Sequence, residues 1–172
     1  MFEKFGEFDS VEELNRAAAA QLKEGDTEAL IALALENGMD KEDAEDYIDG
    51  CVEELATPLM AATGKLKLEE EELELKGVVE DWKDSVVELC MNDAEMCAAV
   101  RKKGKTLKDC MARLIKFAFE NKVQISDKIV DATKVMHNGK LEKMRKPLYL
   151  GVPNRAEVKK LIREYYLGEK KK

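Results

Sequence analysis

The sequence predicts an all-α protein built from about seven to eight short helices. Only 3 Pro and 10 Gly occur in 172 residues, and Ala, Leu, Glu and Lys, which favour helices, are abundant. Apolar residues recur at helical spacing, and most of these stretches follow a residue that caps helix N-termini. One short extended segment, near 65–75 or at 148–150, is the expected exception.

Three helices are predicted within residues 1–50. Each follows a polar side chain that can accept a hydrogen bond from a free backbone N–H at a helix start: Ser10, Asp26 and Asp40. Each ends at residues that readily adopt a left-handed conformation: Gly25, Asn37, Gly38 and Gly50. Together with the remaining residues up to 64, these helices are expected to form an acidic helical subdomain.

The segment from residue 51 onward is harder to assign. Residues 51–56 favour a short helix, and a further turn is expected to start at Pro58, since proline suits the first position of a helix. From residue 65 the chain alternates Lys-Leu-Lys-Leu, passes through four glutamates and ends in Leu-Glu-Leu, a period of two. We therefore expect a charged linker or extended segment over residues 65–77.

Residues 78–168 predict a second helical subdomain with a basic surface, followed by a disordered tail at 169–172. The first helix carries Trp82 on its apolar stripe. Helices are expected over 78–91, 93–100, 106–121, 126–135 and 154–168, with a basic loop at 137–147 and a short strand or extended segment at 148–150.

The net charge of −7 conceals an uneven distribution of charge along the chain. Residues 1–95 contain 28 Asp+Glu and 8 Lys+Arg, a net charge of −20, whereas residues 96–172 contain 8 and 21, a net charge of +13. The electric field of such a charge distribution influences which surfaces approach one another more than it influences the fold. The charge pattern therefore predicts a binding protein, and it leaves open whether the two halves dock on each other.

Two sets of charged residues are candidate binding surfaces. The acidic set is a predicted partner-binding face on the third helix and consists of Asp40, Glu42, Asp43, Glu45, Asp46 and Asp49. The basic set could hold nucleic-acid phosphates with salt-dependent affinity and consists of Arg101, Lys102, Lys103, Lys105, Lys108, Lys140, Lys143, Arg145 and Lys146. The two sets predict opposite halves of the chain as the binding surface.

The sequence favours a non-enzymatic protein without a metal or cofactor. The single histidine, His137, lies in a lysine-rich stretch, and no partner acid can be placed beside it. The four cysteines are scattered without a Cys-x-x-Cys pair, which favours reduced thiols in the core. No apolar run is long enough to span a bilayer, and no secretion signal is apparent, so a cytoplasmic protein that does not bind membranes is expected.

Residues 92–115 read NDAEMCAAVRKKGKTLKDCMARLI: an acidic residue opens a short helix, and Lys-Thr-Leu and a cysteine introduce a second, apolar helix. This segment resembles the PcfK-like family of conjugative plasmids and phages, some members of which inhibit the RNA-guided nuclease of type II CRISPR systems. The resemblance implies a phage or mobile-element protein that binds a host or CRISPR-effector protein, with its acidic helices as a nucleic-acid-like surface. The alternative is a helical protein that binds DNA or RNA through its basic C-terminal half.

Overall fold

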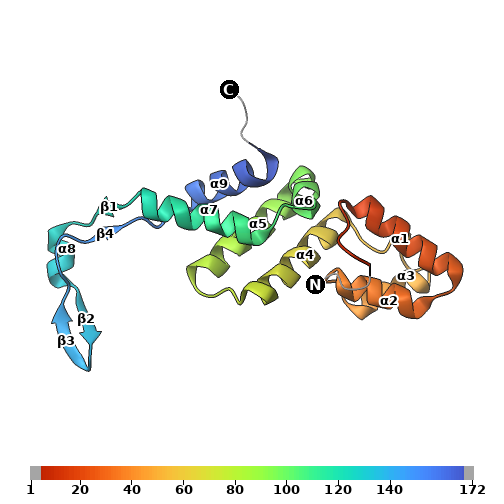
Figure 1. Ribbon diagram of the computed structural model, residues 1–172, viewed down its shortest axis with the longest axis horizontal. Coiled ribbons are helices and arrows are strands. Elements are labelled where there is room, and N and C mark those ends of the chain that lie inside the picture. Colours follow the sequence, from red (N-terminus) through yellow and green to blue (C-terminus); the bar gives the residue numbers. More distant parts are fainter. Residues whose placement is uncertain (1–4, 169–172) are drawn as a thin grey trace.

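The computed structural model describes residues 5–168, so the tail expected at 169–172 lies outside the described residues. Within this range the chain forms nine helices and four short strands in two separate two-stranded sheets, which confirms the predicted helical fold. The molecule is elongated: α1–α3 lie at one end, a helical bundle lies in the middle, and an extension with the strands lies at the other end (Figure 1).

The first three helices form as the sequence predicts: α1 (Val11–Glu24), α2 (Thr27–Glu36) and α3 (Lys41–Ile48). The expected capping residues are in place, because Ser10 and Asp26 each accept a hydrogen bond from a backbone N–H and Asp40 starts a capping box. The three helices enclose a small hydrophobic core together with the start of the next helix; its buried residues include Leu14, Leu30, Leu33, Tyr47, Leu55 and Ala61.

Residues 65–73 are helical, which corrects the expected linker or extended segment at 65–77. They belong to α4 (Pro58–Leu73), which starts at Thr57 and Pro58. The short helix expected at 51–56 is absent, and this stretch is irregular. The alternating pattern was misleading because Lys65 and Glu69, which the sequence places in solvent, are one helical turn apart and both buried.

The helix α4 contributes to two cores. Ala61 packs with α1–α3, while the next residue, Ala62, and Leu66 belong to the core of the central bundle. A continuous helix has one backbone hydrogen bond per residue and no flexible joint. The two helical parts of the molecule are therefore joined by a rigid element instead of a linker.

Three further helices pack against α4 in the bundle: α5 (Val78–Asn92), α6 (Ala94–Arg101) and α7 (Leu107–Glu120). The last helix, α9 (Arg155–Leu167), packs against these three. Trp82 is buried among them, as its place on the apolar stripe predicts. The bundle core also contains Val86, Met96, Leu107, Leu114, Ile162 and Tyr166.

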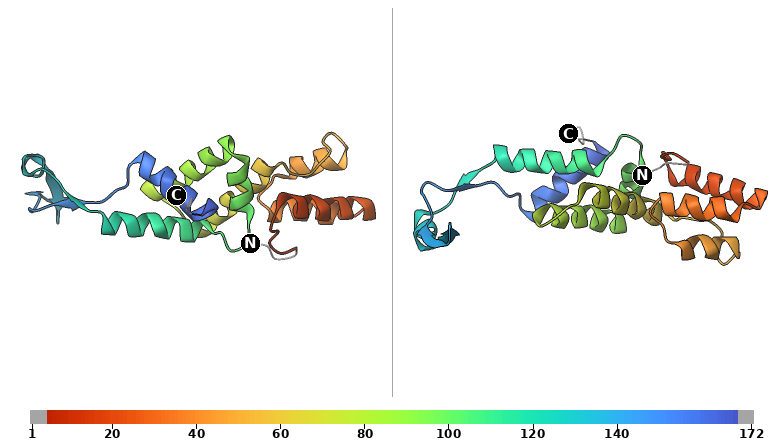
Figure 2. Two further views of the ribbon diagram at one scale, coloured as in Figure 1. Left: turned by 90° about the horizontal axis from the view of Figure 1, so that it is seen from above. Right: turned by 60° about the horizontal axis from the view of Figure 1, so that its bottom comes forward.

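Between α7 and α9 the chain leaves the bundle and returns, and we call residues 121–153 the arm. It contains β1 (Val123–Gln124), α8 (Asp127–Ala132), β2 (Lys134–His137), β3 (Lys140–Lys143) and β4 (Tyr149–Leu150). Antiparallel pairs join β1 to β4 and β2 to β3. Figure 2 shows the arm projecting from the bundle, opposite α1–α3, in two further directions.

The arm corrects two expectations and confirms a third. The helix expected to reach Val135 ends at Ala132, and the basic loop expected at 137–147 contains one strand of a hairpin. The hairpin forms because Asn138 and Gly139 both have positive φ, 49° and 75°, which a tight two-residue turn requires. The extended segment expected at 148–150 is present as β4.

Candidate binding surfaces

The acidic candidates lie on or beside α3, but they are not equivalent. Asp40 pairs with Lys67 at 3.2 Å, Glu45 pairs with Lys41, and Asp43 accepts the Asp40 backbone N–H at 2.9 Å in the capping box. The remaining three are exposed and form no ion pair with a cation of residues 5–168; they are Glu42, Asp46 and Asp49. Their spacing of four and three residues places them on one helix face.

A groove of about 420 Å³ borders this face. Its apolar lining comes from Val52, Leu55 and Met60, and carboxylates lie around it: Asp43, Asp46, Glu53 and Glu54. Val52 is 43% exposed, so part of the apolar lining is open to solvent. We call this feature the acidic groove. It combines apolar area with negative charge, a pairing that suits a cationic segment bearing an apolar side chain.

The turn between α6 and α7 was expected to hold five phosphate-binding cations, and the structure corrects this set. Arg101 is 1% exposed and packs against α4, so it cannot reach a ligand in solvent. Lys105 is half-buried, donates a hydrogen bond to the Tyr165 carbonyl at 2.6 Å and lies over the Tyr165 ring. The exposed cations that remain at this turn are Lys102, Lys103 and Lys108.

The other basic candidates lie on the arm. Lys140, Lys143 and Arg145 are exposed, whereas Lys146 is held in ion pairs with Asp131 at 2.7 Å and Asp127 at 4.0 Å. The hairpin register places Lys143 directly opposite Lys134, a residue outside the basic set that the sequence predicts. Like charges opposite one another destabilise a strand pair, so an anion from outside the described chain would stabilise the hairpin.

The structure does not bring the two basic groups together. The turn between α6 and α7 is part of the central bundle, and the hairpin is at the tip of the arm (Figure 1). Lys103 also donates its backbone N–H to Asp9 at 2.9 Å, so an acidic side chain lies against this turn.

The two differently charged halves do contact each other, through α5 and α9. Glu88 pairs with Arg155 at 2.8 Å and with Lys159 at 2.7 Å, and Asp93 pairs with Arg163 at 2.9 Å. These cations hold the pKa of the Glu88 and Asp93 carboxyls below their ordinary values. Part of the opposite charge is therefore neutralised at the surface between α5 and α9, whereas the exposed row on α3 and the exposed lysines of the hairpin form no such ion pair within residues 5–168.

The structure contains a buried polar cluster that the sequence did not reveal, where α1–α3 meet the bundle. Arg101 donates to the Asn37 side chain at 2.5 Å, and Asn37 is itself fully buried and donates to the Leu33 carbonyl at 2.8 Å. Lys65 pairs with Glu7 at 2.7 Å and donates to the Lys102 carbonyl at 3.0 Å. The spacing of Lys65 and Glu69 at one helical turn was the only available signal.

Glu69 is the acidic member of this cluster. It is 7% exposed and accepts the Leu107 backbone N–H at 3.1 Å. Burial raises the pKa of its carboxyl to about 7, although Lys65 and the Leu107 N–H oppose the shift. Burial also lowers the pKa of the Arg101 guanidinium, which nevertheless stays charged at neutral pH. These groups join the two parts of the molecule, and the side chains of Asn37, Lys65, Glu69 and Arg101 are buried.

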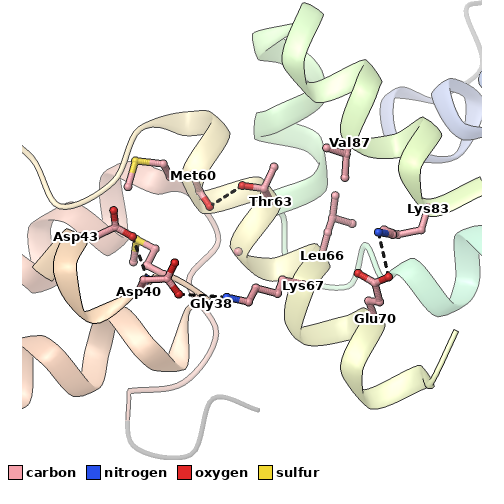
Figure 3. Close-up of a pocket in the computed structure, with 12 residues that line it drawn as sticks. Gly38, Asp40, Asp43, Met60, Thr63, Leu66, Lys67, Glu70, Lys83 and Val87 are labelled. Carbon is pink, nitrogen blue, oxygen red and sulfur yellow. Dashed lines mark hydrogen bonds and ion pairs between the residues drawn. The ribbon is translucent and has the colours of Figure 1, made fainter. Parts of the chain in front are cut away.

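A second groove, of about 460 Å³, lies where α3, α4 and α5 meet (Figure 3). Both of its cations are paired with carboxylates of the lining: Lys67 with Asp40 at 3.2 Å and Lys83 with Glu70 at 3.0 Å. Since each cation already has an anion beside it, this groove offers less unpaired charge than the acidic groove.

The cysteines agree with the prediction except at one position. Cys90, Cys97 and Cys110 are buried, whereas Cys51 is exposed, and all four are free. Burial raises the pKa of the Cys90 and Cys110 thiols to about 12, so both are protonated at neutral pH. Within the described residues, no group of three His, Cys, Asp or Glu side chains is placed to hold a metal ion.

None of the helices over residues 5–168 has the length and apolar character needed to cross a bilayer. Comparison of the chain with protein-family models, curated proteins and solved structures found no match. The resemblance of residues 92–115 to the PcfK-like family therefore stays an expectation. The surfaces of the molecule are what remain to indicate its function.

Proposed function

We propose that this chain is a non-enzymatic binding protein that contacts a cationic protein surface through its acidic end. The observation that supports this most directly is the row of Glu42, Asp46 and Asp49 beside the acidic groove. These carboxylates form no ion pair with a cation among residues 5–168, in contrast with Glu88 and Asp93, which the fold pairs with cations. A surface that keeps its charge accelerates the approach of a partner of opposite charge.

The shape of the molecule supports this function. The helix α4 joins α1–α3 rigidly to the bundle, and α3, which carries the exposed row, belongs to the group of helices at one end of an elongated body (Figure 1). Fixed carboxylates on a helix can substitute for a row of phosphates. A protein that holds nucleic acid in a basic channel is therefore a fitting partner. The family resemblance names one such class, the nuclease of type II CRISPR systems.

Charge reversal on α3 tests the proposal. DNA cleavage by several type II nucleases would be measured with and without an excess of the protein, and with the double variant Glu42→Lys/Asp46→Lys. We expect inhibition by the wild type of at least one nuclease and a loss of at least about tenfold in potency for the variant. The matched control is Glu24→Lys/Glu28→Lys, the same charge change on the exposed surface of α1 and α2.

Undiminished cleavage by every nuclease would remove the CRISPR partner. Binding to a cationic protein as such would then be measured with a basic probe, polylysine, by fluorescence anisotropy at low salt. If the α3 variant and the control bind this probe equally well, the acidic face has no special role and the proposed function is wrong.

Binding of DNA or RNA is the second candidate function, and the facing lysines of the hairpin favour it. Lys134 and Lys143 face each other in the hairpin, at the end away from its turn. The strands of this hairpin, β2 and β3, lie far from α1–α3 in Figures 1 and 2. Screening by salt limits the repulsion from distant carboxylates to about 10 Å. A salt titration of binding to duplex and single-stranded oligonucleotides, with the wild type and Lys134→Ala/Lys143→Ala, tests this function. If this function is correct, the variant binds the oligonucleotides more weakly, and its affinity depends less steeply on salt concentration.

A further inference from the structure

The hairpin at the tip of the arm presents an apolar pair and a basic pair on one face. In an antiparallel pair, residues two apart on a strand point to the same side, so the pair Met136 and Leu141 shares its face with Lys134 and Lys143. Met136 is 69% exposed and Leu141 is 60% exposed. A single two-stranded hairpin has no second layer in which to bury such side chains.

Apolar exposure continues along the rest of the arm. Val123 and Leu150 face one another in the β1–β4 pair, and both are more than half exposed. Ile129 of α8 is 60% exposed, although its neighbour Val130 is fully buried. Exposed apolar side chains concentrated in one projecting segment are typical of an interaction surface.

The acidic groove has the complementary properties. It is lined by Val52, Leu55 and Met60, and carboxylates lie around it, whereas the hairpin presents Met136 and Leu141 with lysines beside them. Both surfaces are thus apolar and charged, with opposite sign. Two complementary properties at one contact favour a specific partner over a general electrostatic attraction.

The two surfaces cannot meet within one molecule. In Figures 1 and 2 the hairpin and α1–α3 lie at opposite ends, separated by the bundle, and the rigid α4 fixes the acidic end in place. We propose that the arm of one copy of this chain docks in the acidic groove of a second copy. This inference rests on the proposed function in so far as both assign the acidic groove to a cationic protein segment.

Such a contact joins unlike surfaces, so each copy keeps one unused arm and one unused groove. Association therefore continues from copy to copy unless it closes into a ring. Because both charged surfaces are exposed, added salt weakens the contact. A cationic partner protein competes with the arm for the groove, so self-association and partner binding exclude each other at that site.

Sedimentation velocity of the full chain tests the inference. At about 20 mM NaCl we expect the weight-average mass to rise with protein concentration, and at about 500 mM NaCl we expect the apparent dissociation constant to weaken by at least about tenfold. Two variants each remove one surface: Lys134→Ala/Lys143→Ala on the arm, which leaves no charge that the altered groove could attract, and Asp46→Lys/Glu53→Lys at the groove. Each alone is expected to be monomeric, and Lys160→Glu on α9 is a control that should associate like the wild type.

Mixing the two variants provides the decisive measurement. The arm variant keeps its groove and the groove variant keeps its arm, so the mixture should form a one-to-one dimer and nothing larger. A mixture that stays monomeric, or a wild type whose mass does not change with concentration at low salt, overturns the inference. Circular dichroism of both variants confirms that they are folded before the mixture is interpreted.

Three outcomes separate this inference from the other proposals. If the arm variant associates like the wild type but loses affinity for an oligonucleotide, the arm binds nucleic acid and the inference is wrong. If the groove variant loses the polylysine probe while the wild type stays monomeric, the proposed function stands and the second copy is not the partner. If the wild type associates through arm and groove but does not bind polylysine, only the proposed function fails.

Discussion

The backbone of Gly38 lies directly against the backbone of Gly64. A Cβ atom on Gly38 would lie 2.1 Å from the Gly64 carbonyl oxygen, and a Cβ on Gly64 would lie 2.3 Å from the Asn37 carbonyl oxygen. This approach brings the end of α2 onto α4 and places the neighbouring Asn37 within reach of Arg101. The contact between these two glycines therefore sets how α1–α3 meet the rest of the molecule.

Replacing Gly38 should destabilise the fold well beyond the backbone strain alone. Gly38→Ala combines a positive φ of 75° with the clash against Gly64. Gly50→Ala is the matched control, because its φ is 74° and nothing lies within 4 Å of the added Cβ. In urea unfolding we expect the free energy of unfolding to fall by about 1 kcal/mol for the control and by about 3 kcal/mol or more for Gly38→Ala. Equal losses of stability in the two variants would mean that the close approach of Gly38 and Gly64 does not contribute to stability.

Replacing Gly64 tests the same contact from inside a helix. Gly64 lies within α4, where alanine ordinarily stabilises a helix by about 1 kcal/mol relative to glycine. We expect Gly64→Ala to destabilise the protein instead, because the added Cβ meets the Asn37 carbonyl. Thermal unfolding followed by circular dichroism measures the sign, and a raised melting temperature would contradict the close packing of α2 on α4.

Removing the Asn37 side chain should weaken the junction between α2 and α6. Asn37→Ala removes an acceptor of the buried Arg101 guanidinium, and we expect a loss on the order of 2 kcal/mol. Asn121→Ala is the matched control: this side chain makes the same type of bond to the carbonyl four residues earlier, but on an exposed helix end. In urea unfolding, the free energy of unfolding should fall by less than about 1 kcal/mol for the control, which is less than for Asn37→Ala.

Glu69 should make stability fall as the pH rises. Its folded pKa of about 7 exceeds the ordinary 4.5, so the folded state binds the proton more tightly than the unfolded state between these values. Glu69→Gln removes this effect and keeps an acceptor for the Leu107 N–H. We expect the variant to unfold like the wild type near pH 4.5 and to be more stable above pH 7, on the order of 2 kcal/mol.

The control for Glu69 is Glu71→Gln, which lies on the same helix, is exposed and is not among the charges that shift the Glu69 pKa. Its difference from the wild type should be small at every pH. Free energies of unfolding measured across about pH 4 to 9 test whether Glu69 causes the pH dependence of stability. If Glu69→Gln keeps the pH dependence of the wild type, the carboxyl is not the group that titrates in this window.

Local chemistry explains why most helix starts were predictable. Ser10, Asp26, Thr106 and Asn154 each accept a hydrogen bond from a backbone N–H of the helix that they precede, an interaction that involves only nearby residues. The segment at 65–73 was mispredicted for the opposite reason. Its helix buries Lys65 and Glu69 against partners far away in the sequence, Glu7 and Leu107, which no local pattern contains.

The candidate binding surfaces also include residues that local spacing predicts and residues that only the fold reveals. Glu42, Asp46 and Asp49 are exposed as the helical spacing suggests. Arg101 is buried instead. It is the last residue of α6, it lies against α4, and Asn37 at the end of α2 accepts its hydrogen bond. The acidic groove was missed altogether, since Val52 and Met60 come from different segments and only the fold places them beside the carboxylates.

The sequence by itself determined the helical class of this protein, most of the helix starts and the opposite charge of its two halves. These properties follow from residue type and short spacing, and packing does not alter them. Only the tertiary structure decided which charges stay available to a partner. It neutralised Glu88 with Arg155 and Lys159, buried Arg101 and left the α3 row and the arm exposed at opposite ends. Burial and ion pairing depend on residues that are distant in the chain, so they appear only when the helices are packed.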